Sequence, residues 1–147
     1  MNTDPVFDLT IIKDASGSRI ETPFCTASLL EPGIVENKIK EGAFIDVSEI
    51  YLLKAANEKL SGNEKYGILV ISADFNAISD EARNITADAS FVRNTLGKAL
   101  LVHNAASKLV GNIYISFNKP KMPTRLFTDR DKALKWLRDL KEGKVHS

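Results

Sequence analysis

The segment YGILVISADF, at residues 66–75, has the pattern of a strand that is buried on both faces. An uninterrupted apolar run follows Gly67, and polar residues bound the run on both sides. A run this short predicts a central strand rather than a helix. A second run, KALLVH at residues 98–103, has the same character. Helical spacing between the two runs predicts a strand–helix–strand unit with parallel pairing.

Upstream of this unit, the pattern predicts a β-hairpin with strands at residues 24–30 and 34–39. Pro32 and Gly33 lie between the strands. Proline presets φ at the first central position of a type II turn, and glycine supplies the positive φ that the next position needs. The fold therefore begins with an antiparallel pair.

Three helix starts carry capping residues. Asp46 can accept hydrogen bonds from free backbone amides, while the side chain of Glu49 reaches back to the backbone N–H of Asp46. Ser79 precedes two acidic residues, which complement the helix dipole. Thr128 and Asp131 have the same capping-box spacing as Asp46 and Glu49. The corresponding helices are predicted at residues 47–60, 80–96 and 129–140, with Gly97 ending the second.

Residues 105–117 fit two patterns, since their apolar positions match both helical spacing and strand alternation. Gly111 weakens the helix interpretation. A short strand at 124–127 follows the proline-containing loop 118–123. The alternating order of strands and helices favours a helix at 105–117, and it predicts an α/β fold with a mixed sheet.

Composition describes an ordinary globular chain. The 147 residues fit one domain, and the net charge of +1 gives no indication of nucleic-acid binding or of a membrane surface. The stretch 119–147 carries nine basic against four acidic residues, which is typical of a solvated helix face. The lone Cys25, the lack of a signal-peptide pattern and the lack of any long apolar run predict a cytoplasmic protein without stable membrane insertion.

The expected architecture is a mixed sheet of four to five strands, with an N-terminal hairpin and four helices packed mainly on one side. We expect residues 1–23 to form an arm or an extra edge strand, residues 24–142 to form the domain, and residues 143–147 to be a C-terminal tail.

Four strings resemble a known family: Glu81-Ala82-Arg83, Leu109-Val110-Gly111-Asn112, Pro123–Thr128 and Ala133–Leu137. They are similar to the STAS domain, the SpoIIAA-like fold of anti-sigma-factor antagonists, and more closely to small bacterial STAS/SEC14-like proteins. The resemblance covers roughly residues 24–140 and implies the STAS fold.

In antagonist-type STAS proteins, an Asp and a phosphorylatable Ser follow the central strand, where a partner protein docks. The resemblance therefore implies a partner-binding or phosphorylation loop containing Asp74, Asn76 and Ser79. His103 and Asn104 follow the next strand, and we expect them at the same edge, where open α/β sheets usually bind ligands. A phosphate at a helix N-terminus would meet free amides. The alternative is that Ser79 is only an N-cap and that His103 is a hydrogen-bonded residue at a strand end.

No spacing of nucleophile, base or metal ligands predicts an enzyme, and no cofactor or metal is expected. The sequence therefore predicts a non-enzymatic regulatory module that binds a protein partner and forms a homodimer through an uncovered edge. The alternative is a small-molecule or lipid carrier of the SEC14-like type. An enzyme using His103 is the third hypothesis.

Overall fold

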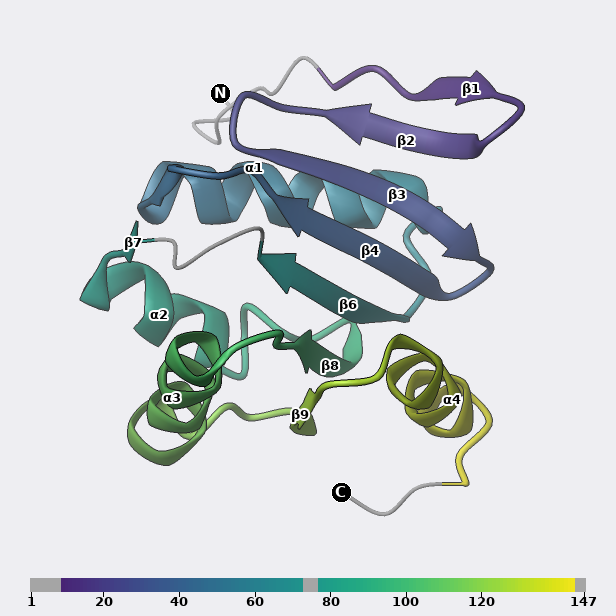
Figure 1. Cartoon of the computed structure of the whole chain (residues 1–147). Coiled ribbons are helices and arrows are strands. Elements are labelled where there is room, and N and C mark those ends of the chain that lie inside the picture. Colours follow the sequence, from purple (N-terminus) through teal and green to yellow (C-terminus); the bar gives the residue numbers. More distant parts are fainter. Residues whose placement is uncertain (1–8, 73–76, 145–147) are drawn as a thin grey trace.

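Seven strands form the main sheet of the computed structural model, which describes residues 9–72 and 77–144 (Figure 1). The predicted four- to five-stranded sheet was therefore too small. Strands β1 to β4 pair antiparallel, and β4, β6, β8 and β9 pair parallel. In spatial order the strands are β1 (Ile12–Asp14), β2 (Gly17–Glu21), β3 (Cys25–Glu31), β4 (Ile34–Ile39), β6 (Tyr66–Ser72), β8 (Thr95–Leu101) and β9 (Thr124–Phe127). A separate two-stranded sheet joins β5 (Phe44–Ile45) to β7 (Ala77–Ile78).

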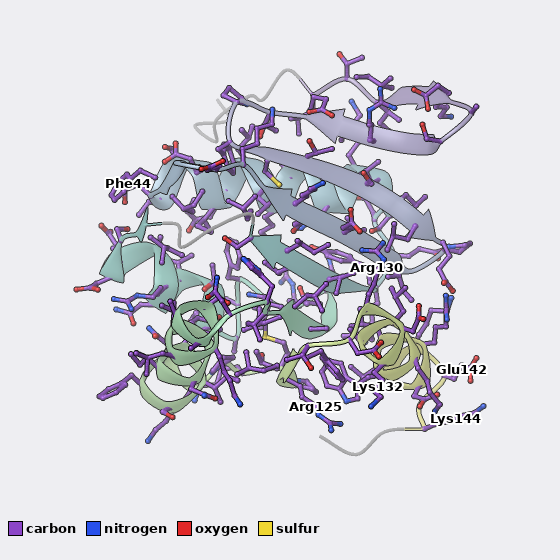
Figure 2. The ribbon with its side chains drawn as sticks, viewed as in Figure 1. Phe44, Arg125, Arg130, Lys132, Glu142 and Lys144 are labelled. Atoms are coloured by element: carbon purple, nitrogen blue, oxygen red, sulfur yellow. The ribbon has the colours of Figure 1, made fainter. Side chains whose placement is uncertain are left out.

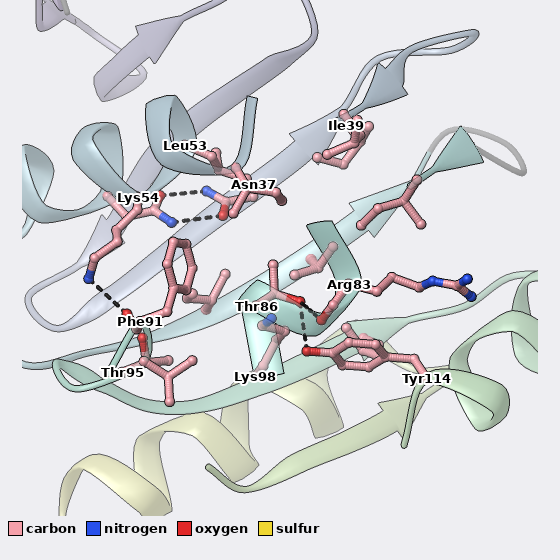
Figure 3. Close-up of a pocket in the computed structure, with 18 of the residues that line it drawn as sticks. Asn37, Ile39, Leu53, Lys54, Arg83, Thr86, Phe91, Thr95, Lys98 and Tyr114 are labelled. Atoms are coloured by element: carbon pink, nitrogen blue, oxygen red, sulfur yellow. Dashed lines mark hydrogen bonds between the residues drawn. The ribbon is translucent and has the colours of Figure 1, made fainter. Parts of the chain in front are cut away.

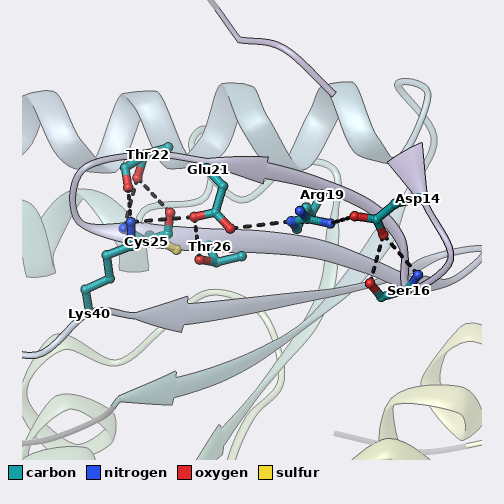
Figure 4. A network of polar contacts seen from close by, with 8 residues as sticks. All are labelled: Asp14, Ser16, Arg19, Glu21, Thr22, Cys25, Thr26 and Lys40. Atoms are coloured by element: carbon teal, nitrogen blue, oxygen red, sulfur yellow. Dashed lines mark hydrogen bonds and ion pairs between the residues drawn. The ribbon is translucent and has the colours of Figure 1, made fainter. Parts of the chain in front are cut away.

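The strands β1 and β2 add an antiparallel hairpin at one edge of the sheet. Charged side chains run along it: Arg19 pairs with Asp14 at 2.6 Å and with Glu21 at 3.5 Å, and Glu21 pairs with Lys40 at 3.5 Å (Figure 4). Side chains of β1 are all exposed, so this edge lacks a strong apolar alternation in the sequence. Charges on an edge strand also oppose pairing with another chain.

Helices cover both faces of the main sheet. The apolar residues Ile68 and Val70 of β6 pack in clusters with the side chains of α1, whereas Leu69 packs with Leu137 and Trp136 of α4. Because successive strand residues point to opposite faces, α4 lies on one face and α1 on the other. The helices are α1 (Val47–Leu60), α2 (Asp80–Ala87), α3 (Ala105–Ile113), which continues as the π-helix η1 (Tyr114–Asn118), and α4 (Arg130–Lys141).

The helix starts confirm two of the three predicted caps. Asp46 and Glu49 form the capping box of α1, and the Ser79 side chain accepts from the backbone of Ala82 in α2. Asp129, not Thr128, caps α4, since its carboxylate accepts from the N–H of Lys132 at 3.1 Å. A carboxylate one residue later is the stronger competitor for the same free amides.

Two predicted boundaries around Gly97 were wrong. Helix α2 already ends at Ala87, and Gly97 lies inside β8, which runs from Thr95 to Leu101. Gly97 sits directly under α4: a Cβ built on it would be 2.4 Å from Leu140 Cδ1 and 3.1 Å from the carbonyl oxygen of Pro123. Glycine at this position therefore serves close packing of a helix on a strand, rather than helix termination.

Cys25 lies at the start of β3, fully buried. Burial raises the pKa of its thiol to about 12. Because the thiolate is the nucleophile, we expect Cys25 in the folded protein not to react with Ellman's reagent at pH 8, and to react fully after denaturation in guanidinium chloride. Absorbance of the released thiolate measures both states. Fast labelling of the folded protein would contradict this assignment.

The sign of the accompanying pH effect follows from the same shift. The unfolded thiol ionises near its ordinary pKa of 9.0, whereas the folded thiol ionises only near 12. Between about pH 9 and pH 12, deprotonation of the Cys25 thiol therefore favours the unfolded chain. The contribution of Cys25 to stability is complete below about pH 9 and is lost as the pH rises through 12.

Candidate functional site

An apolar cavity lies between one face of the main sheet and the layer of α1, α2 and α3 (Figure 3). Its volume is about 250 Å³. The strands β4, β6 and β8 form its floor, and residues of the three helices and of the loop before β8 complete the wall. Most of the wall is aliphatic or aromatic, including Ile39, Ile50, Leu53, Ile68, Val70 and Phe91.

The size of this cavity sets it apart from ordinary packing defects. Protein interiors are close-packed, and voids larger than a water molecule are few. An apolar cavity of about 150 Å³ already accommodates a benzene molecule. The cavity described here is larger, and it can take a compact ligand with on the order of ten non-hydrogen atoms.

Two asparagines form the polar part of the floor nearest to α1. Asn37 of β4 and Asn57 of α1 are 1% and 2% exposed. Asn37 Nδ2 donates to Asn57 Oδ1 at 2.7 Å, and Asn57 Nδ2 donates to Asn37 Oδ1 at 2.9 Å (Figure 3). This reciprocal pair satisfies both buried amides, and it fixes α1 against the sheet.

Hydroxyl groups lie on the opposite wall. The Thr86 hydroxyl of α2 donates to the carbonyl oxygen of Arg83 at 2.8 Å and lies 3.0 Å from the Tyr114 hydroxyl. A second tyrosine, Tyr66, lines the cavity from β6, and burial raises the pKa of its phenol to about 12. Tyr66 is therefore uncharged at neutral pH, so its ring belongs to the apolar surface.

Three cationic side chains reach the cavity wall. Lys54 Nζ donates to the carbonyl oxygen of Phe91 at 2.8 Å and pairs with Glu58 at 2.7 Å. Arg83 pairs with Asp80, and its buried Nε has no hydrogen-bond partner in the part of the chain that the structure describes.

The third cation, Lys98 of β8, is half-buried, and its Nζ lies 5.4 Å from the centre of the Tyr114 ring. Figure 3 shows Lys98 on the same side of the cavity as Thr86 and Tyr114. An ammonium, two hydroxyls and an aromatic face therefore share one wall.

The predicted loop is only partly covered by the structure. Asp74 and Asn76 lie outside the described residues. The Ser79 hydroxyl accepts from the Ala82 N–H at 3.1 Å and donates to Asp46 Oδ1 at 2.8 Å. Ser79 therefore links the starts of α1 and α2, and its hydroxyl is engaged in two hydrogen bonds.

His103 and Asn104 lie beyond the end of β8 and are exposed. Asn104 caps α3 by accepting from the Ser107 N–H at 2.8 Å. Within residues 9–72 and 77–144, no hydrogen bond joins Ser79 to either residue. The structure thus assigns capping contacts to Ser79 and Asn104, and a partner-binding or phosphorylation role of these residues and of His103 stays a prediction.

The sequence does not mark the cavity directly, because its lining comes from many segments spread between Asn37 and Met122. One signal was available: Asn37 stands between Val35 and Ile39 on the apolar face of its strand. A buried polar residue requires a partner, so this position marks a polar contact in the core. Lys98, in the middle of β8, is a second signal of the same kind.

Ion pairs join two arginines of the basic C-terminal stretch to the sheet. Arg130 of α4 pairs with Glu36 at 2.6 Å, and Arg138 pairs with Glu31 at 2.8 Å. Figure 2 shows Arg130 directed toward the sheet, while Lys132 and Lys144 project from α4 and the residues after it. The arrangement matches a solvated helix face tied to β3 and β4.

Among the described residues, no group of three or more His, Cys, Asp or Glu side chains could hold a metal ion. None of the helices in that part of the chain is both long enough and apolar enough to cross a membrane.

Comparison with known proteins gives a family and a likeness to a solved structure. No curated protein matches the sequence at a significant level. An uncharacterized DUF3478-family protein from Shewanella loihica PV-4, with a SpoIIAA-like fold, matches at a TM-score of 0.46 and 10% identity, covering 92% of this chain and 99% of that chain. No assignment rests on a likeness at this level. A family model described as "Domain of unknown function (DUF7793)" matches residues 28–141, so the chain belongs to the DUF7793 family.

Proposed function

We propose that this protein binds a small, mainly apolar molecule in the cavity between the sheet and α1, α2 and α3. The observation that carries the proposal is the cavity itself, with its volume of about 250 Å³ and its largely apolar wall. This is the carrier function that the sequence analysis raised as an alternative. Ligand sites in proteins are commonly concave and apolar, with a few well-placed polar groups.

An apolar ligand in the cavity would remove its own surface and the apolar wall from water, a gain of roughly 25 cal/mol per Å² of apolar surface buried. Because such a ligand binds the folded chain and not the unfolded one, it would stabilise the folded state.

Cavity filling tests this function. Val110 lines the cavity from α3, and Val110→Phe places a ring in the space that a ligand would occupy. We expect octan-1-ol to bind the wild type saturably, and V110F to bind it at least about tenfold more weakly. Chemical-shift titration of the backbone amides measures both affinities.

The neighbouring Leu109 supplies the matched control, because it is 61% exposed on the outer side of the same helix. Leu109→Phe adds the same ring outside the cavity and is expected to leave octanol binding unchanged. Octanol binding that is absent from the wild type, or equal in V110F and the wild type, would rule out the cavity as a ligand site.

The protein-binding, regulatory STAS-like role stays a prediction, as do the homodimer and the absence of enzymatic activity. For the phosphorylation switch, the relevant observation is that the Ser79 hydroxyl already donates to Asp46. A phosphate there would stand beside that carboxylate, and like charges repel.

A further inference from the structure

The charges around the cavity are not equally balanced. Lys54 has Glu58 as its counter-charge, and Arg83 has Asp80. Within residues 9–72 and 77–144, the Lys98 ammonium has no carboxylate partner and donates no hydrogen bond; it lies over the face of the Tyr114 ring. Of the three cations that line the cavity, Lys98 alone lacks a counter-charge in this part of the chain.

The hydroxyls beside Lys98 have hydrogen-bonding capacity left. Because Thr86 donates its proton to the carbonyl oxygen of Arg83, it accepts from Tyr114. When Tyr114 instead donates to a ligand oxygen, Thr86 keeps its bond to the carbonyl. The Tyr114 hydroxyl can therefore turn to a ligand while Thr86 loses only an accepted bond. Lys98 and Tyr114 together offer donors at one place in an otherwise apolar wall.

We propose that the ligand is an amphipathic carboxylate, with an aliphatic tail in the apolar part of the cavity and its carboxylate against Lys98 and Tyr114. The proposal rests on the function proposed above and specifies its ligand class. A partly buried ammonium without a partner is unfavourable, and a carboxylate supplies both the opposite charge and hydrogen-bond acceptors.

The charge balance favours a carboxylate over a phosphate. Lys98 contributes one positive charge, which a carboxylate neutralises. A phosphate monoester carries about −1.5 to −2 at neutral pH and would leave negative charge uncompensated in the apolar site. The balanced pairs of Lys54 and Arg83 supply no further positive charge.

Octanoate and octan-1-ol test the head group, since both are unbranched eight-carbon molecules and fit the size estimate. Titration calorimetry at pH 7.5 gives both affinities for each variant, and the ratio of the two isolates the head-group contribution. We expect the wild type to prefer octanoate by about tenfold or more, the effect of a charge-assisted hydrogen bond. Lys98→Met should reduce the ratio to about one.

Lys108→Met is the matched control, because Lys108 is exposed on α3 and does not line the cavity. It removes the same charge and should keep the wild-type ratio. A preference that persists in K98M, or that disappears equally in K108M, would overturn the proposal.

The wild-type measurement separates the two proposals without any variant. Equal binding of octanoate and octanol overturns the carboxylate inference and leaves the apolar cavity as a ligand site. Failure of both molecules to bind overturns the proposed function and the inference with it. The wild-type ratio is decisive even where K98M does not fold.

Discussion

Asn57→Leu is expected to lower the free energy of unfolding by about 3 kcal/mol, whereas the double variant Asn37→Leu/Asn57→Leu recovers most of that loss. The single change removes both reciprocal hydrogen bonds and leaves the amide of Asn37 buried without a partner. An unsatisfied buried polar group costs about 1–3 kcal/mol, in addition to the hydrogen bonds lost. The double variant leaves no buried amide at this position, and both leucines face the adjoining cavity, where there is room for them.

Urea unfolding of the wild type, the two single variants and the double variant completes a double-mutant cycle. Asn112→Leu is the control, because Asn112 is exposed on α3 and its replacement should change stability by less than about 0.5 kcal/mol. If the loss of unfolding free energy in the double variant equals the sum of the losses in the two single variants, the reciprocal pair would be contradicted.

Gly97→Ala is expected to destabilise the protein by about 2–3 kcal/mol, through overpacking rather than through a cavity. The added methyl group meets Leu140 Cδ1 at 2.4 Å and the carbonyl oxygen of Pro123 at 3.1 Å. The leucine can turn away, but the carbonyl belongs to the backbone beside β9. Either α4 moves outward or the strand shifts.

The paired glycine of β6 provides the comparison. Gly67 is the register partner of Gly97, and a Cβ there would lie 3.1 Å from Leu137 Cδ2, the end of a side chain. Gly67→Ala is therefore expected to cost less than Gly97→Ala, by at least about 1 kcal/mol. Thermal unfolding of both variants ranks them, and equal midpoints would show that α4 adjusts freely to a larger strand surface.

The strands and helices were predictable where the apolar pattern was strong. Burial on both faces made β6 visible as a continuous run, and Asp46 and Ser79 marked their helices by ordinary capping chemistry. The apolar pattern was weak at β1, whose side chains are exposed, so the predicted number of strands was too low. The prediction that Gly97 ends a helix was wrong because glycine is typical of turns and of close packing alike, and only the position of α4 distinguishes the two uses.

The cavity could not be predicted in the same way, because no local pattern encodes an empty space. Asn37 and Asn57 are 20 residues apart, and their pairing depends on the docking of α1. Lys98 and Tyr114 come from β8 and η1, which approach each other only when the strands are in register. Ser79 and His103, the candidates chosen from the ends of two predicted strands and helices, do not line this cavity.

The cavity also makes the two faces of the sheet respond differently to hydrostatic pressure. The volume change of unfolding scales with the internal void that is eliminated, so the part of the cavity that is closed to water makes this side of the sheet the more sensitive to compression. The α4 side, where glycines bring the helix into tight contact with β6 and β8, has little such volume to lose. Filling the cavity would remove this difference, and the partial molar volume of the protein would then report on occupancy without any label.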